Sequence, residues 1–479
     1  MPSALIALAL GALLAACGIP FAWSFLTPVV LGVLFAFAAG APTSRGAAAR
    51  LFWAGLAFFT LTLYWLPQSF GTGFGIFGVL MFVPLYALEA FFWGVLGWAS
   101  WRLGSRTETR LWLLAFLWVV LEWLRHLGQI AFPWGTVGYT LLPLPVVQIA
   151  DLGGVLLLSL LVSTTAAVLA LALRGHTRPL LGAVVVWSAA VAYGLTRPEL
   201  TGEPGRALLL RTNVNSFEKA KGAGSSFESQ FEAQMRLSRQ IDPGEVLVWS
   251  ETAVFVHPDF DQRTLLPRRE MITGVGFPQR NSAVSWNGAI LGEYDKMQLV
   301  PFGEFYPWRE PLRPAYAWIW SRLLGVPFNP PNPGRAATPL PLGPHAYGTY
   351  ICYDSVFPGV TRGLVGAGAE VLVNVSNDGW YDESLGVEQH FQMGRLRAIE
   401  TRRYVMRSVN LGVAAVVDER GRVRQRFSGP GEEALHARFQ YLRGTTPFVR
   451  FGNGPVLALC VLGLLASVLV DRLAGRAPR

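Results

Sequence analysis

The chain has 479 residues, of which 52% are hydrophobic and only 15% are charged, and its formal net charge is +9. Soluble domains carry about 25% charged residues, so this composition excludes an ordinary soluble protein. The arginines lie beside apolar blocks or are dispersed, with no basic stripe among aromatic residues, so no nucleic-acid partner is expected.

Eight apolar runs are long enough to cross a membrane as helices, because a bilayer core of about 30 Å needs about 20 helical residues. They lie at residues 4–22, 25–41, 51–68, 74–100, 111–128, 154–173, 179–195 and 454–471. Seven runs precede a long polar segment and one follows it. We therefore expect a membrane bundle over residues 1–196, a polar domain over residues 197–450, and a final transmembrane helix with its tail over residues 451–479.

Arginines after every second run predict the orientation of these helices, because positive charge near a span favours the cytoplasmic side. They are Arg45, Arg50, Arg102, Arg106, Arg110, Arg174, Arg178, Arg472, Arg476 and Arg479. An even alternation over eight spans places both termini in the cytoplasm. Residues 197–450 are then expected on the extracytoplasmic face of the inner membrane.

The polar segment contains short strand-like runs mixed with helices. Strands are expected at residues 207–210, 245–249, 271–277, 282–286, 289–293, 347–352, 370–375 and 412–418, and helices at about 226–241, between 352 and 370, and at 387–408. Asn287-Gly288 predicts a hairpin turn. This mixture predicts a layered α/β domain with its own core.

Residues 307–343 are rich in proline but include a short aromatic piece around Trp318 and Trp320. That piece is too short to span a bilayer. It is either packed on the polar domain or part of a mobile lid, whose aromatic side chains would lie at the lipid interface.

Cys352 is the only cysteine of the polar segment, since Cys17 and Cys460 fall in apolar runs. An exported domain with a single thiol and no disulfide is a candidate for a reactive cysteine. The alternative is that Cys352 is a small buried hydrophobic residue.

Glu251 and Lys296 each end a strand-like run, as Cys352 does. A thiol that attacks an ester or amide carbonyl needs a base and a positive group for the oxyanion, and Glu251 and Lys296 provide these two functions. Alternatively, Glu251 caps a helix and Lys296 is a surface charge. Their position at the ends of successive strands favours the catalytic interpretation.

Five blocks of sequence carry a resemblance to a known family. Trp-Ser-Glu-Thr at residues 249–252, Tyr-Asp-Lys-Met-Gln-Leu-Val-Pro-Phe-Gly-Glu at 294–304 and Ile-Cys-Tyr-Asp at 351–354 resemble the three signatures of the nitrilase superfamily. The blocks at 374–380 and 389–401 resemble its membrane-bound branch, the apolipoprotein N-acyltransferases. The resemblance implies an αββα sandwich on a polytopic helical membrane bundle of about eight transmembrane helices.

The resemblance also implies a reaction in two steps. Cys352 attacks an acyl ester of a phospholipid and forms a thioester, and the α-amine of a diacylglyceryl apolipoprotein then accepts the acyl group. Glu251 is the implied general base, Lys296 the oxyanion stabiliser and Glu304 a second carboxylate. The partners are thus a phospholipid donor, an apolipoprotein acceptor and membrane lipids, without a cofactor or a metal ion.

Several other residues are expected near this site. Tyr353 and Asp354, directly after the cysteine, are supporting candidates. Trp318, Trp320, Trp380 and Tyr381 are candidates for substrate or lid contacts. Three positions depart from the family pattern, namely Ala220, Ser250 and Asp354, and Ala220 bears on how the lipid is held.

Two other functions stay open. A membrane-anchored amidohydrolase would use the same residues with water as the acceptor. A transporter or receptor with an outer binding domain would need ionisable residues along a pathway in the membrane, and mainly Glu89 and Glu122 are available there.

Overall fold

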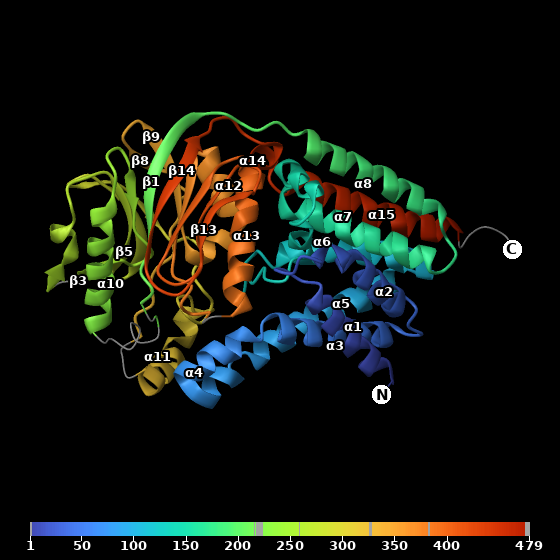
Figure 1. The fold of residues 1–479 in the computed structure, drawn as a ribbon. Helices are drawn as coiled ribbons and strands as arrows, with labels where there is room; N and C mark the ends of the chain where they lie inside the picture. The colour runs from blue at the N-terminus through green and yellow to red at the C-terminus, as the bar shows by residue number, and fades with distance from the viewer. Residues whose placement is uncertain are drawn as a thin grey trace. The chain divides into compact units, whose positions relative to one another are not determined.

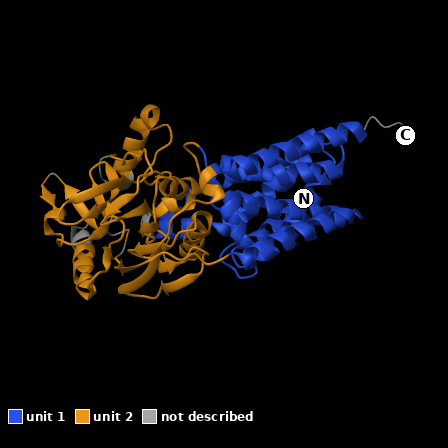
Figure 2. Cartoon of the chain, turned by 90° about the horizontal axis from the view of Figure 1, so that it is seen from above, with its two compact units in different colours: residues 1–127, 132–197, 451–479 blue, residues 128–131, 198–450 orange. Residues whose placement is uncertain are grey.

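The computed structural model describes residues 2–214, 216, 224–257, 259–324, 328–381 and 384–474. It forms two compact units (Figure 2). Unit 1 comprises residues 1–127, 132–197 and 451–479, and unit 2 comprises residues 128–131 and 198–450. Residues 128–131, from the loop after an apolar helix, belong to unit 2, whereas the sequence predicted them in the membrane bundle.

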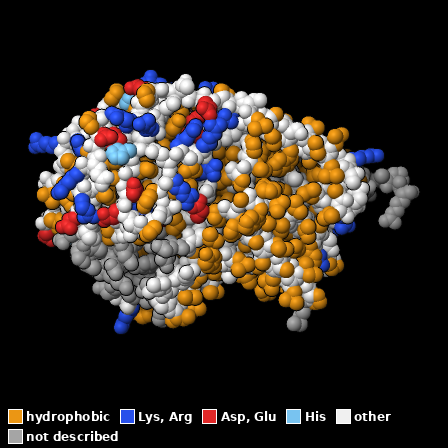
Figure 3. All heavy atoms as spheres, in the orientation of Figure 1, with side chains coloured by type: hydrophobic (Ala, Val, Ile, Leu, Met, Phe, Trp, Pro, Cys, Tyr) orange, Lys and Arg blue, Asp and Glu red, His pale blue; other side chains and the backbone are white. Residues whose placement is uncertain are grey.

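Unit 1 is built from apolar helices. They are α1 (Pro2–Ala16), α2 (Thr27–Ala39), α3 (Ser44–Thr62), α4 (Trp65–Leu80), α5 (Val83–Leu103), α6 (Thr107–Leu124), α7 (Ala150–Ala172), α8 (Arg178–Thr196) and α15 (Gly454–Ala474). Large apolar side chains gather on the face of unit 1 seen in Figure 3, and Leu181 of α8 is 72% exposed. A surface this apolar is stable against lipid, where the backbone polar groups must be paired inside helices.

Among the described residues, four helices are long and apolar enough to cross a membrane, or five if α3 and the start of α4, bent by 49°, count as one span. The span predicted over residues 74–100 corresponds to the candidate span Gly78–Leu103, which starts within α4 and continues through α5 after a turn at residues 81–82. Gly75 within α4 has φ +60°, a left-handed conformation that interrupts the helix and favours glycine.

Unit 2 contains fourteen described strands, which form two halves joined by a single parallel pair, Arg211 with Val409. The first half has the order β14 (Glu433–Tyr441), β1 (Glu203–Arg211), β2 (Val246–Val248), β5 (Met271–Phe277), β6 (Arg280–Trp286) and β7 (Ile290–Asp295). Strand β3 (Val254–His257) also pairs with β5, and β4 (Phe260–Asp261) pairs with β3. The second has the order β13 (Val423–Phe427), β12 (Ala414–Val417), β11 (Val405–Val409), β10 (Val371–Ser376), β9 (His345–Ile351) and β8 (Leu340–Leu342).

The two halves pack face to face, with β6 and β7 against β8 and β14 against β12. Helix α10 (Gly224–Leu237) covers the outer face of the first half, and α12 (Pro358–Gly366) and α13 (Leu385–Thr401) cover the second (Figure 1). Phe231 of α10 packs on Trp249 in the core beneath it. The layers are therefore helix, sheet, sheet and helix, the αββα order expected from the resemblance.

Local chemistry explains where the expected elements were right and wrong. The hairpin between β6 and β7 is confirmed, with Gly288 at φ +81°. The expected helix over residues 387–408 is too long. It ends at Thr401, Arg402 takes a left-handed conformation, and β11 follows. Because β11 is buried on both sides, its sequence does not alternate and resembles a helical continuation.

The segment of residues 307–343 contains a helix that the sequence analysis did not predict, α11 (Arg309–Leu324). Pro314 lies inside α11, and a proline within a helix lowers the helical signal of the sequence. Strands β3, β4, β8, β13 and β14 were also missed, and most of them lie at sheet edges or alternate weakly.

Candidate active site

The predicted site residues follow the carboxyl ends of strands. Glu251 lies in the loop after β2, Lys296 directly after β7, and Cys352 directly after β9. Cys352 begins the short 3-10 helix η6 (Cys352–Val356). Strands of both halves thus bring an acid, an amine and a thiol into one region of unit 2.

Lys296 lies between two carboxylates. Its Nζ is 3.0 Å from Glu251 Oε1 and 2.8 Å from Glu304 Oε2. Asn281 on β6 donates from Nδ2 to both carboxylates, at 2.8 Å to Glu251 Oε1 and 3.2 Å to Glu304 Oε1. The Val300 N–H donates to Glu304 Oε2 at 3.0 Å. Each carboxylate is therefore held by at least two donors.

The electrostatics of this cluster fix the charge of the lysine. Burial lowers the pKa of Lys296, but the carboxylates of Glu251 and Glu304 outweigh burial and hold the pKa well above its ordinary value. Lys296 is therefore a permanently charged donor, only 2% exposed. A fixed positive charge in a water-poor site stabilises a developing oxyanion well.

Cys352 has an unusual backbone and a neutral thiol. Its φ of +47° is left-handed, which for a residue with a side chain stores about 1–3 kcal/mol and is typical of functional sites. Burial, and then the charge of Glu251, raise the pKa of the Cys352 thiol, while Lys296 lowers it less. The thiol is therefore protonated at rest, and its proton must leave as the sulfur attacks.

Asp354 connects the nucleophile to the lysine loop. Its Oδ2 accepts hydrogen bonds from the Tyr294 hydroxyl at 2.8 Å and the Ile351 N–H at 3.0 Å, and its Oδ1 accepts one from the Gln298 N–H at 2.7 Å. Burial raises the pKa of Asp354 to about 6. Because Tyr294 and Gln298 flank Lys296, this one carboxylate fixes the lysine loop against the turn that carries Cys352.

The remaining candidates near the cysteine differ in position. The Tyr353 hydroxyl donates to the Ala131 carbonyl at 3.5 Å, and its ring packs edge-on against Phe357. Tyr381 is buried, with a pKa raised well above its usual value by burial and then by electrostatic coupling to Cys352. Tyr381 thus lies close to the nucleophile, and the neighbouring Trp380 is half-buried.

The two tryptophans of α11 have different environments. Trp320 packs edge-on against Tyr306, with ring centroids 5.4 Å apart, and also contacts Phe328. Trp318 is 64% exposed. Trp320 is therefore packed against other aromatic rings, whereas Trp318 lies at the surface, and a lid role for either residue stays a prediction. Ala220 lies outside the described residues.

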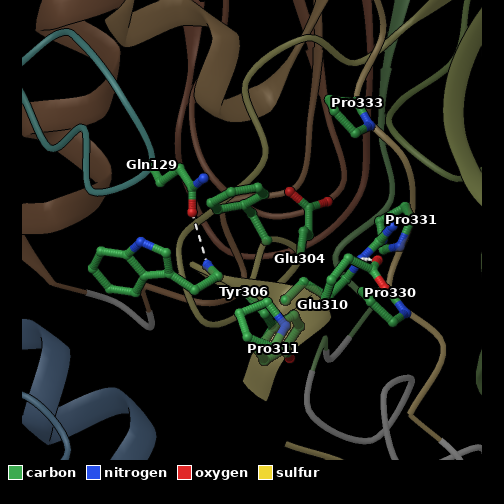
Figure 4. Close-up of a pocket in the computed structure, with 11 residues that line it drawn as sticks. Gln129, Glu304, Tyr306, Glu310, Pro311, Pro330, Pro331 and Pro333 are labelled. Atoms are coloured by element: carbon green, nitrogen blue, oxygen red, sulfur yellow. Dashed lines mark hydrogen bonds and ion pairs between the residues drawn. The ribbon is translucent and has the colours of Figure 1, made fainter. Parts of the chain in front are cut away.

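A cavity of about 460 Å³ opens beside Glu304 (Figure 4). The Trp308 N–H donates to Gln129 Oε1 at 2.7 Å across its rim. Of the residues around Lys296, Glu304 borders this space, which is of ligand size. The cavity is lined by Gln129, Glu304, Phe305, Tyr306, Trp308, Arg309, Glu310, Pro311, Pro330, Pro331 and Pro333.

The sequence analysis assigned no role to Asn281 or to a second buried cluster, Asp378, His390 and Arg407. Asp378 and His390 do lie in the two blocks that resemble the acyltransferase branch, but without structure nothing linked them to Cys352. Side-chain atoms of Cys352, Asp378 and His390 lie within 4.8 Å of one another, a spacing that suits a metal. The Arg407 guanidinium, 2.6 Å from Asp378 Oδ2, instead supplies the positive charge there.

Comparison with known proteins agrees with this geometry. Residues 10–168 match the family model of the apolipoprotein N-acyltransferase N-terminal domain, and residues 279–439 match that of carbon-nitrogen hydrolases. An apolipoprotein N-acyltransferase of Azotobacter vinelandii is 32% identical over 99% of this chain and 96% of its own length. The chain belongs to the apolipoprotein N-acyltransferase family.

A second relative with the same name, from Nitrosomonas europaea, is 34% identical over 87% of this chain and 86% of its own. A crystal structure of a carbon-nitrogen hydrolase from Helicobacter pylori G27 has a TM-score of 0.36, with 16% identity over 50% of this chain and 90% of that one. The matched carbon-nitrogen hydrolase model confirms the nitrilase-like fold, and the family membership makes the chain an acyltransferase.

Proposed function

We propose that this member of the N-acyltransferase family transfers an acyl chain from a phospholipid to the α-amine of the diacylglyceryl cysteine of an apolipoprotein, through a thioester on Cys352. The observation that carries the proposal is the charged Lys296, held between Glu251 and Glu304 and electrostatically coupled to a neutral buried thiol. This arrangement suits acyl transfer at a carbonyl group.

In the first step, Cys352 Sγ attacks the ester carbonyl carbon while Glu251 takes the thiol proton. Lys296 stabilises the negative charge on the carbonyl oxygen, an interaction worth about 3–4 kcal/mol in comparable sites. The ester C–O bond then breaks. The proton passes from Glu251 to the leaving oxygen, which departs as the hydroxyl of a lysophospholipid.

In the second step, the neutral α-amine of the acceptor attacks the thioester carbon. Lys296 again stabilises the oxyanion, and the C–S bond breaks as the amide forms. The amine loses one proton to Glu251, and Glu251 returns that proton to the sulfur, so the neutral thiol is restored. Glu304 keeps Lys296 in place during both steps, and Asp354 keeps the Cys352 turn against the lysine loop.

Membrane anchoring follows from the two lipid-linked substrates. We infer eight spans, seven before residue 197 and one after residue 450, with both termini cytoplasmic and unit 2 on the extracytoplasmic face of the inner membrane. The arginine distribution supports this orientation, and the apolar outer surface of unit 1 supports its position in the membrane.

Intact-protein mass spectrometry tests the proposal. The detergent-solubilised protein is incubated with a phospholipid of known acyl composition, with Cys352→Ala as the matched control. We expect one added acyl mass that maps to Cys352, is removed by hydroxylamine and is absent from the control. A diacylglyceryl-cysteine peptide should then remove the adduct and become N-acylated.

Two results would contradict the proposal. Loss of the adduct without acylation of the peptide would identify a hydrolase that uses water as the acceptor. A folded protein that never forms the adduct would show that Cys352 does not carry the acyl group.

A further inference from the structure

A second buried cluster lies behind the nucleophile and has no part in the reaction steps above. His390 Nδ1 is 2.8 Å from Asp378 Oδ1 and 3.1 Å from an Arg407 guanidinium nitrogen. Arg407 also donates to Asp378 Oδ2 at 2.6 Å and to Asn374 Oδ1 at 2.6 Å. Two charged side chains, Asp378 and Arg407, thus fix one edge of the imidazole ring.

The cluster is rigid and fully enclosed. Asp378 and His390 have no exposed surface, and Arg407 is 3% exposed. Burial raises the pKa of Asp378, but Arg407 and His390 outweigh it and hold that pKa at about 2, so the carboxylate is ionised throughout the physiological range. A buried ion pair of this kind gives little net stability but defines geometry well.

The other edge of the ring faces Cys352. His390 Nε2 is 2.7 Å from Ser355 Oγ and 3.2 Å from the Cys352 carbonyl oxygen. With a proton on Nε2, the ring donates to this carbonyl oxygen, which can only accept. The contact is made with the peptide group of Cys352, the one residue of η6 that has a left-handed φ. Rotation of that peptide would move both the sulfur and the following N–H groups.

We propose that His390, oriented by Asp378 and Arg407, is a positioning residue for Cys352: it holds the carbonyl oxygen of the nucleophile and thereby keeps the left-handed turn that aims the sulfur. The inference builds on the proposed function, because it assigns a role within the same site. It concerns residues that the sequence did not associate with the nucleophile.

Two substitutions separate positioning from simple packing. His390→Gln retains an amide donor near the Nε2 position, whereas His390→Asn retains only the Nδ1 side. We expect His390→Asn to slow both thioester formation and alkylation of Cys352 by iodoacetamide about tenfold, the usual effect of losing one such hydrogen bond. His390→Gln should recover most of the rate, and the KM for phospholipid should not change.

Glu400→Gln is the control, because Glu400 is buried on the same helix and pairs with Arg397 at 3.0 Å. It should lower the melting temperature as His390→Asn does but leave the alkylation rate unchanged. Equal alkylation rates in wild type, His390→Gln and His390→Asn would overturn the proposal, as would equal slowing by Glu400→Gln.

Ser355→Ala covers the case in which the His390 variants do not fold, since it removes only the hydroxyl on Nε2. We expect a severalfold slower alkylation, and an unchanged rate would count against the proposal. Alkylation is read at the Cys352 peptide and needs no acyl substrate. A wild-type protein that is alkylated but never acylated would therefore refute the proposed function and still allow the role of His390 to be judged.

Discussion

Asp354→Asn should change the activity of this protein much more than its stability. Asp354 is fully buried, and burial raises its pKa from 3.8 to about 6. This shift changes the free-energy difference between the protonated and the ionised carboxyl group by about 3 kcal/mol. Because the folded pKa lies above the unfolded one, this stabilising contribution is present below pH 3.8 and is lost as the pH rises through about 6. An asparagine, which has no charge, removes that pH dependence.

The substitution also has a cost. The Asp354 carboxylate accepts hydrogen bonds at both oxygens, whereas an asparagine places an NH2 group at one of them. A donor then faces the Gln298 N–H or the Tyr294 hydroxyl, and one unsatisfied buried donor costs about 1–3 kcal/mol. This destabilisation nearly offsets the stability that the protein gains when the buried negative charge is removed. We therefore expect the free energy of unfolding at pH 7 to change by less than about 2 kcal/mol.

Activity should respond much more strongly. With one side of the connection broken, the lysine loop is no longer fixed against the Cys352 turn, and we expect thioester formation to fall by about 100-fold. In the wild type, the rate should also decline below about pH 6, as Asp354 takes up a proton. The assays are melting temperature and acyl-adduct formation, both from pH 5 to 8.

Tyr294→Phe is the matched control, because it removes one of the three donors and leaves the carboxylate charge intact. It should retain the acid limb of the pH profile and lose less activity than Asp354→Asn. Wild-type rates in Asp354→Asn would refute the argument, and so would an acid limb that persists in that variant.

Three further predictions concern the rest of the site. Asn281→Leu removes the donor shared by Glu251 and Glu304, so we expect acyl-adduct formation to fall at least tenfold, measured as initial rates by mass spectrometry. Lys296→Met should reduce the same rate by about 10²–10³-fold, because the oxyanion loses its charged donor; a loss below tenfold would contradict that role. Trp320→Ala should destabilise unit 2 by about 2 kcal/mol in denaturant unfolding, whereas Trp318→Ala, on the exposed face of α11, should leave unfolding unchanged. Equal effects of the two tryptophans would contradict their different packing.

The sequence predicted the chemical groups of the site better than their supports. Glu251, Lys296 and Cys352 stood out because each ends an apolar strand-like run, a pattern that depends only on local sequence. Their supports are not local. Asn281 is 30 residues from Glu251, and Asp354 is 56 residues from Gln298. Hydrogen bonds over such separations depend on strand pairing, which composition and periodicity do not specify.

Asp354 illustrates the same limit. In the sequence it is a carboxylate that departs from the family pattern, with no indicated partner. In the fold, this side chain lies where three donors from two segments meet. The missed end of α13 has a similar cause, because only the neighbouring strands β10 and β12 make residues 405–409 a strand.

The two buried clusters together explain why a neutral thiol suits this site. Burial and the charge of Glu251 raise the pKa of the Cys352 thiol more than Lys296 lowers it, and Asp378 of the second cluster raises it further, so both clusters oppose a standing thiolate. A thiolate is the form that oxidants attack, so a protonated, 4% exposed thiol is protected on the extracytoplasmic side proposed for unit 2. Activation then depends on substrate, because the proton leaves only as the acyl carbonyl arrives beside Lys296. Asp354 on one side and His390 on the other hold the turn that carries Cys352. This fixed position of the sulfur compensates for the nucleophilicity that a lowered thiol pKa would provide.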